Sequence, residues 1–207
     1  HKPWHRFQHF YAWFFYGLMT FIWVTFKDYV ALNRYKKFGL LERMGKSYNN
    51  LFFRITLAKV LYYPVMVGIP LAFSGLAPSQ VILGWLLMHF IGGLTLALVF
   101  QPAHVMEDHN YPASEKGLVM EDDPLSHQLK TTCNFGTKSK LLTWYSGGLN
   151  HQIEHHLFPN ICHVHYRDIA PIVKKTALEF GLPYRSSTTF LDAVKLHTQQ
   201  LKQLGQA

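Results

Sequence analysis

Apolar residues along the chain gather in three stretches, at residues 10–26, 55–73 and 80–100. A helix needs about 20 mostly apolar residues to cross a bilayer, and the second and third stretches have that length. The linker between these two, SGLAPS, is short, uncharged and rich in turn-forming residues. The pattern therefore predicts a membrane-embedded helical hairpin at residues 55–100.

The first apolar stretch, residues 10–26, has basic segments on both sides. Lys2 and Arg6 precede it, and residues 27–54 carry seven Lys and Arg against two acidic residues. Lys and Arg mark the cytoplasmic side of a membrane, and a single crossing would put the two flanks on opposite sides. We therefore predict that residues 1–54 hold an interfacial or re-entrant helix and a basic cytoplasmic segment. An ordinary membrane span is the alternative.

From Gln101 onward the chain is polar, which predicts a cytoplasmic helical domain at residues 101–207. Apolar residues recur there at helical spacing in two segments, residues 165–182 and 188–205, and both segments end at a glycine or next to one. The predicted fold class is mainly α. It comprises a membrane-embedded helical hairpin, interfacial helices and a cytoplasmic helical domain.

The distribution of charge supports a membrane part followed by a polar part. No Asp or Glu occurs between Glu42 and Glu107, and the net charge is +8. The basic residues flank apolar segments instead of forming a stripe with interleaved aromatics, which argues against nucleic acid as a partner. Cys133 and Cys162 lack metal-site spacing and are predicted to be free thiols in a reducing compartment.

The segment HQIEHH, residues 151–156, contains three histidines in six positions. On a helix, successive side chains turn by about 100°, so Gln152, His155 and His156 share one third of the circumference. His151 lies at the border of that face. Neutral imidazole is a ligand for zinc, copper and iron, so the segment predicts a metal site.

Two chemistries use this segment differently. His151, Glu154 and His155 have the H-x-x-E-H spacing of inverted zinc peptidases, in which the glutamate activates a zinc-bound water. That interpretation leaves His156 without a role. The other interpretation places His155 and His156 in a polyhistidine di-iron site and makes Glu154 a structural or outer group. The residues alone leave both interpretations open.

Three segments resemble the membrane fatty acid desaturases, particularly the front-end and linoleoyl-CoA type. GGLNHQIEHHLFPNICHVHY is similar to the third histidine box of that family, which in this group begins with Gln. FQPAHVMED and LKTTCNFG resemble the segments that follow the last membrane helix and lead into the box. The resemblance implies two non-haem iron ions and makes the peptidase the weakest alternative. The metal ligands that it implies are His104, Gln152, His155 and His156.

The resemblance also implies the activity. A fatty acyl desaturase introduces a cis double bond into an acyl chain with O2 and two electrons, here from cytochrome b5 or a ferredoxin. The substrate would be a fatty acyl-CoA or an acyl lipid. The protein would be an integral membrane protein with a cytoplasmic catalytic face, in the endoplasmic reticulum of a eukaryote or the inner membrane of a bacterium. A related di-iron membrane hydroxylase and a non-catalytic membrane module are the alternatives.

A second histidine pair, His5 and His9 in HRFQH, has the spacing of the family's first box. The second box, H-x-x-H-H, does not follow before His104, and the segment instead resembles the region after box two. We therefore expect His5 and His9 not to bind iron. We also expect the first two boxes to lie upstream of His1, so that this chain is a C-terminal fragment and is inactive alone.

The remaining histidines are less informative. His89 lies within the third apolar stretch, where an ionisable residue is either functional or hydrogen-bonded to a neighbouring helix. The others lie in polar segments and are predicted to be surface residues. These are His109, His127, His163, His165 and His197.

Overall fold

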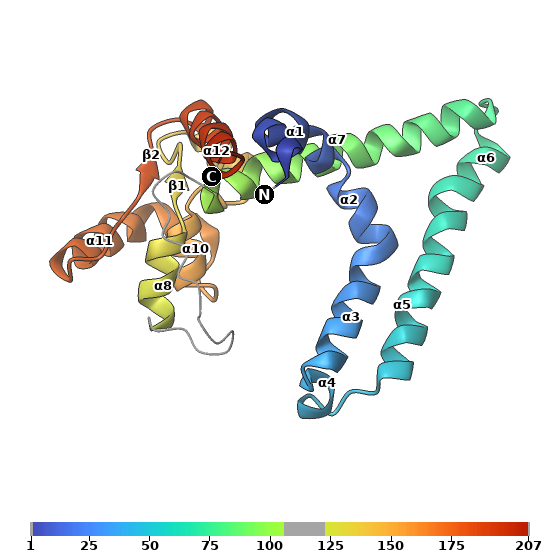
Figure 1. Cartoon of the computed structure of the whole chain (residues 1–207), viewed down its shortest axis with the longest axis horizontal. Coiled ribbons are helices and arrows are strands. Elements are labelled where there is room, and N and C mark those ends of the chain that lie inside the picture. The colour runs from blue at the N-terminus through green and yellow to red at the C-terminus, as the bar shows by residue number, and fades with distance from the viewer. Residues whose placement is uncertain (1, 106–122, 207) are drawn as a thin grey trace. The chain divides into compact units, whose positions relative to one another are not determined.

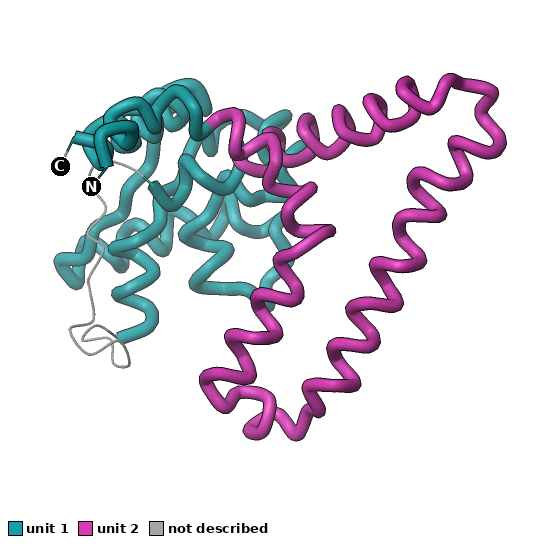
Figure 2. The backbone as a smooth tube through the Cα atoms, turned by 45° about the vertical axis from the view of Figure 1, so that its right-hand side comes forward, with its two compact units in different colours: residues 1–12, 98–207 teal, residues 13–97 magenta. Residues whose placement is uncertain are grey.

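The computed structural model describes residues 2–105 and 123–206 and is mainly helical (Figure 1). The predicted fold class is therefore confirmed. The chain divides into two compact units (Figure 2). Unit 1 comprises His1–Ala12 and Leu98–Ala207, and unit 2 comprises Trp13–Ala97.

Unit 2 consists of helices. Two helical runs, Tyr48–Phe73 and Pro78–His104, are long and apolar enough to cross a membrane. They confirm two helices of membrane-spanning length where the apolar stretches predicted them, and they extend beyond those stretches because polar residues also continue a helix. Their arrangement as a hairpin in a membrane stays a prediction. The elements of unit 2 are the end of α1 (Gln8–Gly17), α2 (Met19–Ile22), η2 (Trp23–Lys27), α3 (Asp28–Lys37), α4 (Leu40–Arg43), α5 (Tyr48–Tyr63), η3 (Pro64–Gly68), α6 (Ile69–Phe73) and most of α7 (Pro78–His104).

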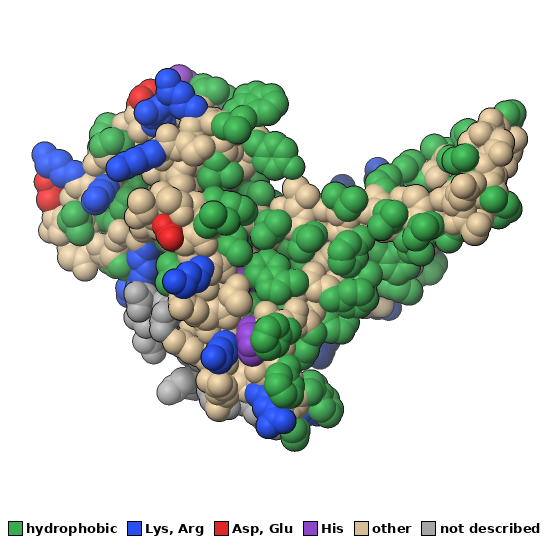
Figure 3. All heavy atoms as spheres, turned by 90° about the horizontal axis from the view of Figure 1, so that it is seen from above, with side chains coloured by type: hydrophobic (Ala, Val, Ile, Leu, Met, Phe, Trp, Pro, Cys, Tyr) green, Lys and Arg blue, Asp and Glu red, His purple; other side chains and the backbone are tan. Residues whose placement is uncertain are grey.

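Large hydrophobic side chains lie on the outer surface of unit 2 (Figure 3). Phe73 and Ile91 are 83% and 62% exposed, respectively. Soluble proteins rarely expose contiguous apolar surface of this kind, whereas lipid covers it without cost. The membrane placement of residues 10–26 and the side on which each region lies stay predictions.

A hydrogen-bonded network surrounds His89 inside unit 2. Its Nε2 lies 2.7 Å from the Tyr62 hydroxyl, and its Nδ1 lies 3.2 Å from Thr20 Oγ1. The Trp85 indole N–H also donates to the Tyr62 hydroxyl, at 3.1 Å. Thr20, Tyr62 and His89 come from α2, α5 and α7, so the network ties three helices together. The structure thus supports the hydrogen-bonded interpretation of His89.

Helices α1 and α7 touch through glycines in unit 2. A Cβ atom added at Gly93 would lie 2.5 Å from the Gly17 carbonyl oxygen and 2.7 Å from that of Tyr16. A Cβ atom at Gly17 would lie 2.3 Å from the Phe90 ring. Small residues let membrane helices approach closely in this way.

The substitution Gly93→Ala is therefore expected to destabilise the protein by about 1–3 kcal/mol, because the new methyl group meets backbone atoms that cannot move aside. Thermal unfolding of the purified protein in detergent measures the effect. Gly92→Ala is the matched control, because a Cβ atom at Gly92 meets nothing within 4 Å. Equal melting temperatures for the two variants would contradict the close contact of α1 and α7.

Unit 1 packs short helices around two apolar clusters. Val99, Ala103, Phe135 and Ala193 form the first cluster, and Leu129, Ile153, Val173 and Ala177 form the second. Two parallel two-residue strands, too short to predict from an alternating pattern, join Asn134 to Ser186 and Phe135 to Ser187. Besides the ends of α1 and α7, its elements are η1 (Pro3–Phe7), α8 (Pro124–Thr131), β1 (Asn134–Phe135), α9 (Lys140–Tyr145), α10 (Gln152–Leu157), η4 (His163–His165), α11 (Tyr166–Glu179), β2 (Ser186–Ser187) and α12 (Phe190–Leu204).

Both predicted amphipathic helices are confirmed, as α11 and α12. Gly181 follows α11 with a φ of +67°, a conformation that favours glycine. Thr189 opens α12 through a capping box with Asp192.

The surface prediction holds for some of the histidines of the polar segments. His163 and His165 are exposed, His127 is partly buried, and His109 lies outside the described residues. The prediction is wrong for His197, which is fully buried with its Nδ1 2.9 Å from the Val105 carbonyl oxygen. Its place on the inner face of α12 explains the difference, and burial lowers its pKa.

Candidate metal centre

The short helix α10 presents two different faces. Gln152, His155 and His156 lie on one side, while Glu154 projects to the opposite side, as the 100° rotation per residue requires. Gln152 and Glu154 are 2% and 0% exposed, respectively. Gly147 and Gly148, with φ of +59° and +80°, turn the chain before the helix.

The side chain of Asn134 on β1 fixes the start of α10. Its Oδ1 accepts the Ile153 backbone N–H at 2.9 Å, which satisfies one of the unpaired donors of the first turn. Its Nδ2 donates to Glu154 Oε2 at 2.8 Å. The Tyr184 hydroxyl donates to Glu154 Oε1, also at 2.8 Å. These bonds hold α10 by its inner face and leave the histidine face free for other contacts.

The opposite face of α10 meets the C-terminal end of α7. Gln152 Nε2 lies 3.1 Å from His104 Nε2 and 2.9 Å from His156 Nε2. The His104 and His156 rings meet edge to face, with centroids 5.2 Å apart. The structure thus brings together three of the four predicted metal ligands, which are separated by up to 52 positions in the chain.

His155, the fourth predicted ligand, lies beside this trio. Its ring centroid is 5.6 Å from that of His156, and its Nδ1 lies 3.4 Å from the Tyr166 hydroxyl. Among the described residues, no three side chains of His, Cys, Asp or Glu stand together as a metal-holding group. The convergent trio instead has the Gln152 amide as its third member.

The electrostatics of the site favour neutral imidazole. Burial, together with the neighbouring His104 and His155 rings, lowers the pKa of His156 to about 4. His156 is therefore neutral at pH 7 and keeps a nitrogen lone pair for a metal ion. The backbone of Thr131 hydrogen-bonds to His104, and such outer partners orient a ligating imidazole.

The trio offers two imidazoles and an amide oxygen, groups that bind first-row metal ions. First-row metal–imidazole bonds are about 2.1 Å long, so two neighbouring ligand atoms on one metal ion stand about 3 Å apart. Gln152 Nε2 lies 2.9 and 3.1 Å from the two imidazole nitrogens, which is a hydrogen-bond distance and is also close to that spacing. Gln152 Oε1 is buried without a hydrogen bond to any described residue. Rotation of the amide by 180° would direct this oxygen between the two imidazoles.

The zinc peptidase interpretation finds no support in this arrangement. Both carboxylate oxygens of Glu154 are engaged by Asn134 and Tyr184, on the side of α10 away from His155 and His156. His151 Nδ1 lies 3.7 Å from Glu154 Oε2, and His151 is 1% exposed. Glu154 is thus built into the core and is not poised over a metal-bound water.

Sequence reasoning missed the groups that support the site. Asn134 and Tyr184 hold Glu154, and Tyr166 contacts His155, but no local pattern marks these residues. Burial raises the pKa of the Cys133 thiol to about 11, so it stays protonated and unreactive. In the described part of the chain, Cys133 and Cys162 are free, as predicted.

The fold and the site define a helical protein with two membrane-length helices and a histidine–glutamine cluster at the end of one of them. The fatty acid desaturase family model matches residues 1–188, so the chain belongs to the fatty acid desaturase family.

Curated relatives agree with this assignment. The sn-1 linoleoyl-lipid 6-desaturase of Synechocystis is 34% identical, over 98% of this chain and 56% of its own length. An acyl-lipid (8-3)-desaturase of Physcomitrium patens is 36% identical, over 97% and 41%. The Delta(5) fatty acid desaturase A of Dictyostelium discoideum is 32% identical, over 97% and 43%. The chain thus spans about half the length of these relatives. No solved structure matches it significantly.

Proposed function

We propose that this chain forms part of a membrane desaturase that introduces a cis double bond into the acyl chain of a fatty acyl-CoA or an acyl lipid. The observation that carries the proposal is the meeting of His104, Gln152 and His156 at 2.9–3.1 Å. Two of the three relatives named above, the linoleoyl-lipid 6-desaturase and the acyl-lipid (8-3)-desaturase, act on acyl groups of lipids, which supports the choice of substrate class.

In this proposal His104, Gln152, His155 and His156 hold iron. Two iron ions with O2 would supply the oxidant that removes hydrogen from two adjacent, unactivated methylene groups. The fold holds the three imidazoles and the amide in place. Tyr166 contacts His155 and the Thr131 backbone contacts His104, and such contacts orient an imidazole. We propose that the remaining ligands come from a part of the protein outside these 207 residues.

The proposal includes the surroundings of the site. The helices Tyr48–Phe73 and Pro78–His104 would anchor the protein in the endoplasmic reticulum or a bacterial inner membrane, where acyl chains reside. His104 ends the second of these helices, so the iron site would lie near the cytoplasmic surface of the membrane. Cytochrome b5 or a ferredoxin would deliver the electrons there.

Product analysis tests the proposed reaction. The intact protein is produced in a yeast host, and the host's fatty acids are converted to methyl esters and compared by gas chromatography and mass spectrometry. We expect a new fatty acid lighter than its precursor by two hydrogens, with a cis double bond. A product heavier by one oxygen would identify a hydroxylase. No new product, despite normal production and a native electron donor, would favour the non-catalytic alternative.

A further inference from the structure

Unit 1 contains an open cavity of about 490 Å³, most of whose lining residues are polar or basic. Lys138, Arg167 and Lys174 line it, and no carboxylate of the described residues does. In the described part of the chain, none of these three cations makes an ion pair. Three like charges around one cavity repel one another, and a bound anion removes that repulsion.

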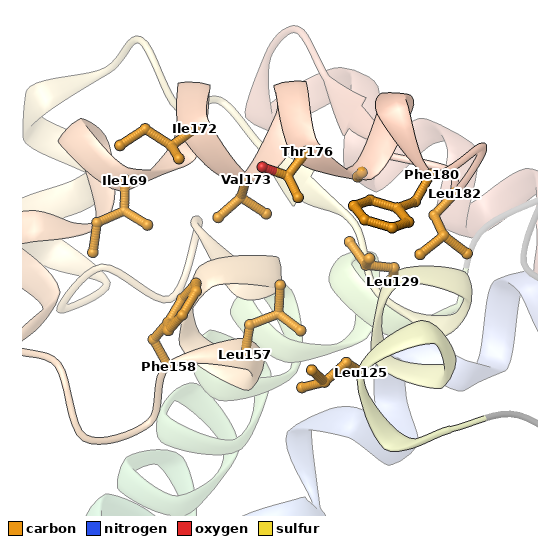
Figure 4. Close-up of a pocket in the computed structure, with 11 residues that line it drawn as sticks. Leu125, Leu129, Leu157, Phe158, Ile169, Ile172, Val173, Thr176, Phe180 and Leu182 are labelled. Atoms are coloured by element: carbon orange, nitrogen blue, oxygen red, sulfur yellow. The ribbon is translucent and has the colours of Figure 1, made fainter.

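Helix α11 supplies two of the cations from one face. Arg167, Ala170, Pro171 and Lys174 follow the i, i+3, i+4, i+7 spacing of a single helical face. The opposite face of α11, with Ile169, Ile172, Val173 and Thr176, lines a separate apolar groove of about 330 Å³ (Figure 4). The two faces of α11 therefore line two different cavities, one with cations and one apolar.

Short strands bring hydroxyl groups to the same cavity. Thr137 follows β1, while Ser186 and Thr188 belong to β2 and the turn after it, and all three residues line the cavity. The parallel pairing of β1 with β2 holds these two segments side by side. Hydroxyl groups donate hydrogen bonds to oxyanions, so the lining offers neutral donor groups beside the three cations.

A buried histidine lies next to the cavity. His151 lines the cavity and is 1% exposed, yet neither of its ring nitrogens makes a hydrogen bond to a described residue. Its nearest carboxylate oxygen, Glu154 Oε2, is 3.7 Å away and already accepts a hydrogen bond from Asn134. Both ring nitrogens are inaccessible to water, so a bound anion would be held by the cations and hydroxyls of the lining and not by His151.

We propose that this cavity binds a phosphate group, carried by a lipid head group or by a soluble phosphorylated compound. A phosphate group has several oxygens at tetrahedral angles, so it accepts hydrogen bonds from separate cations and hydroxyls at once. A carboxylate is planar, and two parallel N–H groups of a single arginine bind both of its oxygens. It would therefore not need three separate cations. Its lining includes none of the four predicted metal ligands, and the site does not depend on the proposed desaturation.

Binding of inorganic phosphate tests the proposal. The purified chain in a phosphate-free detergent is titrated with phosphate by calorimetry at pH 7.5, with sodium chloride keeping the ionic strength constant. We expect saturable binding at one site, weakened at least about tenfold in Lys174→Gln, which loses one charge-assisted contact. Lys175→Gln is the matched control. It removes the same charge from the same helix, but Lys175 lies 3.9 Å from Glu179 and does not line the cavity.

Absence of saturable binding, or equal weakening by Lys174→Gln and Lys175→Gln, would overturn the proposal. Lys138→Gln, in a turn outside the helices, repeats the test if Lys174→Gln fails to fold. Micelles containing phosphatidic acid identify the source. Competition with phosphate that depends on Lys174 indicates a lipid head group, while phosphate binding without such competition indicates a soluble compound.

Discussion

Replacing His156 by alanine in the intact protein is expected to reduce desaturation by at least about 100-fold. Gln152 Nε2 lies 2.9 Å from His156 Nε2 and 3.1 Å from His104 Nε2, so the alanine variant loses the central contact of the trio. Because the pKa of His156 is low, its imidazole is neutral at pH 7 and can give a nitrogen lone pair to a metal ion. Alanine offers no donor atom, and a metal ion at this position would lose a ligand.

The measurement is the amount of new fatty acid, normalised to the amount of protein, together with the iron content of the purified enzyme. His165→Ala is the control, because it also removes an imidazole, but from an exposed residue that is not a predicted ligand. It should keep both activity and iron. Desaturation above about one tenth of the unsubstituted level in His156→Ala, with normal folding, would refute a ligand role for this residue.

Replacing Glu154 by alanine is expected to destabilise the protein by about 3–5 kcal/mol, even though Glu154 is not a predicted ligand. The carboxylate is fully buried and accepts hydrogen bonds from Asn134 Nδ2 and the Tyr184 hydroxyl at 2.8 Å. Alanine leaves the Tyr184 O–H and one N–H of Asn134 Nδ2 without their acceptor, at a cost of about 1–3 kcal/mol each, although Asn134 Nδ2 still donates to the Tyr184 oxygen at 2.9 Å. It also removes one of the two hydrogen bonds that join Asn134 to α10, leaving the bond to the Ile153 backbone N–H.

Thermal unfolding in detergent measures this loss, which corresponds to a decrease of roughly 6–20 °C in melting temperature for a chain of this size. Glu179→Ala is the control. Glu179 pairs with Lys175 only at 3.9 Å on the exposed face of α11, so its loss should change stability by less than about 0.5 kcal/mol. A Glu154→Ala variant as stable as Glu179→Ala would show that the Glu154 hydrogen bonds do not hold α10.

Local patterns predicted the helices well. The apolar runs identified two helices of membrane-spanning length because a bilayer-length helix needs a long, nearly uncharged segment, a property of adjacent residues. The amphipathic spacing and the caps at Thr189 and Gly181 likewise depend on neighbours in the chain, so α11 and α12 lie where they were predicted. Helix ends were less certain, because Tyr48–Phe73 begins seven residues before the apolar stretch.

Burial of single residues was harder to predict. His197 lies in a polar segment, but the packing of α12 places it in the core against Val105. The same holds for His89, whose role depended on whether Tyr62 and Thr20 of other helices reach its ring. Such contacts join residues tens of positions apart, and no local periodicity records them.

The histidine spacing in residues 151–156 by itself determined which side chains share one face of α10, because a helix fixes the angle between successive residues. Only the tertiary structure decided what each face meets. It placed His104, from the end of α7, against Gln152 and His156, and it turned Glu154 toward Asn134 and Tyr184. It also gathered Lys138, Arg167 and Lys174 around one cavity. Those contacts depend on how distant segments pack together, and the order of residues within one segment does not specify that packing.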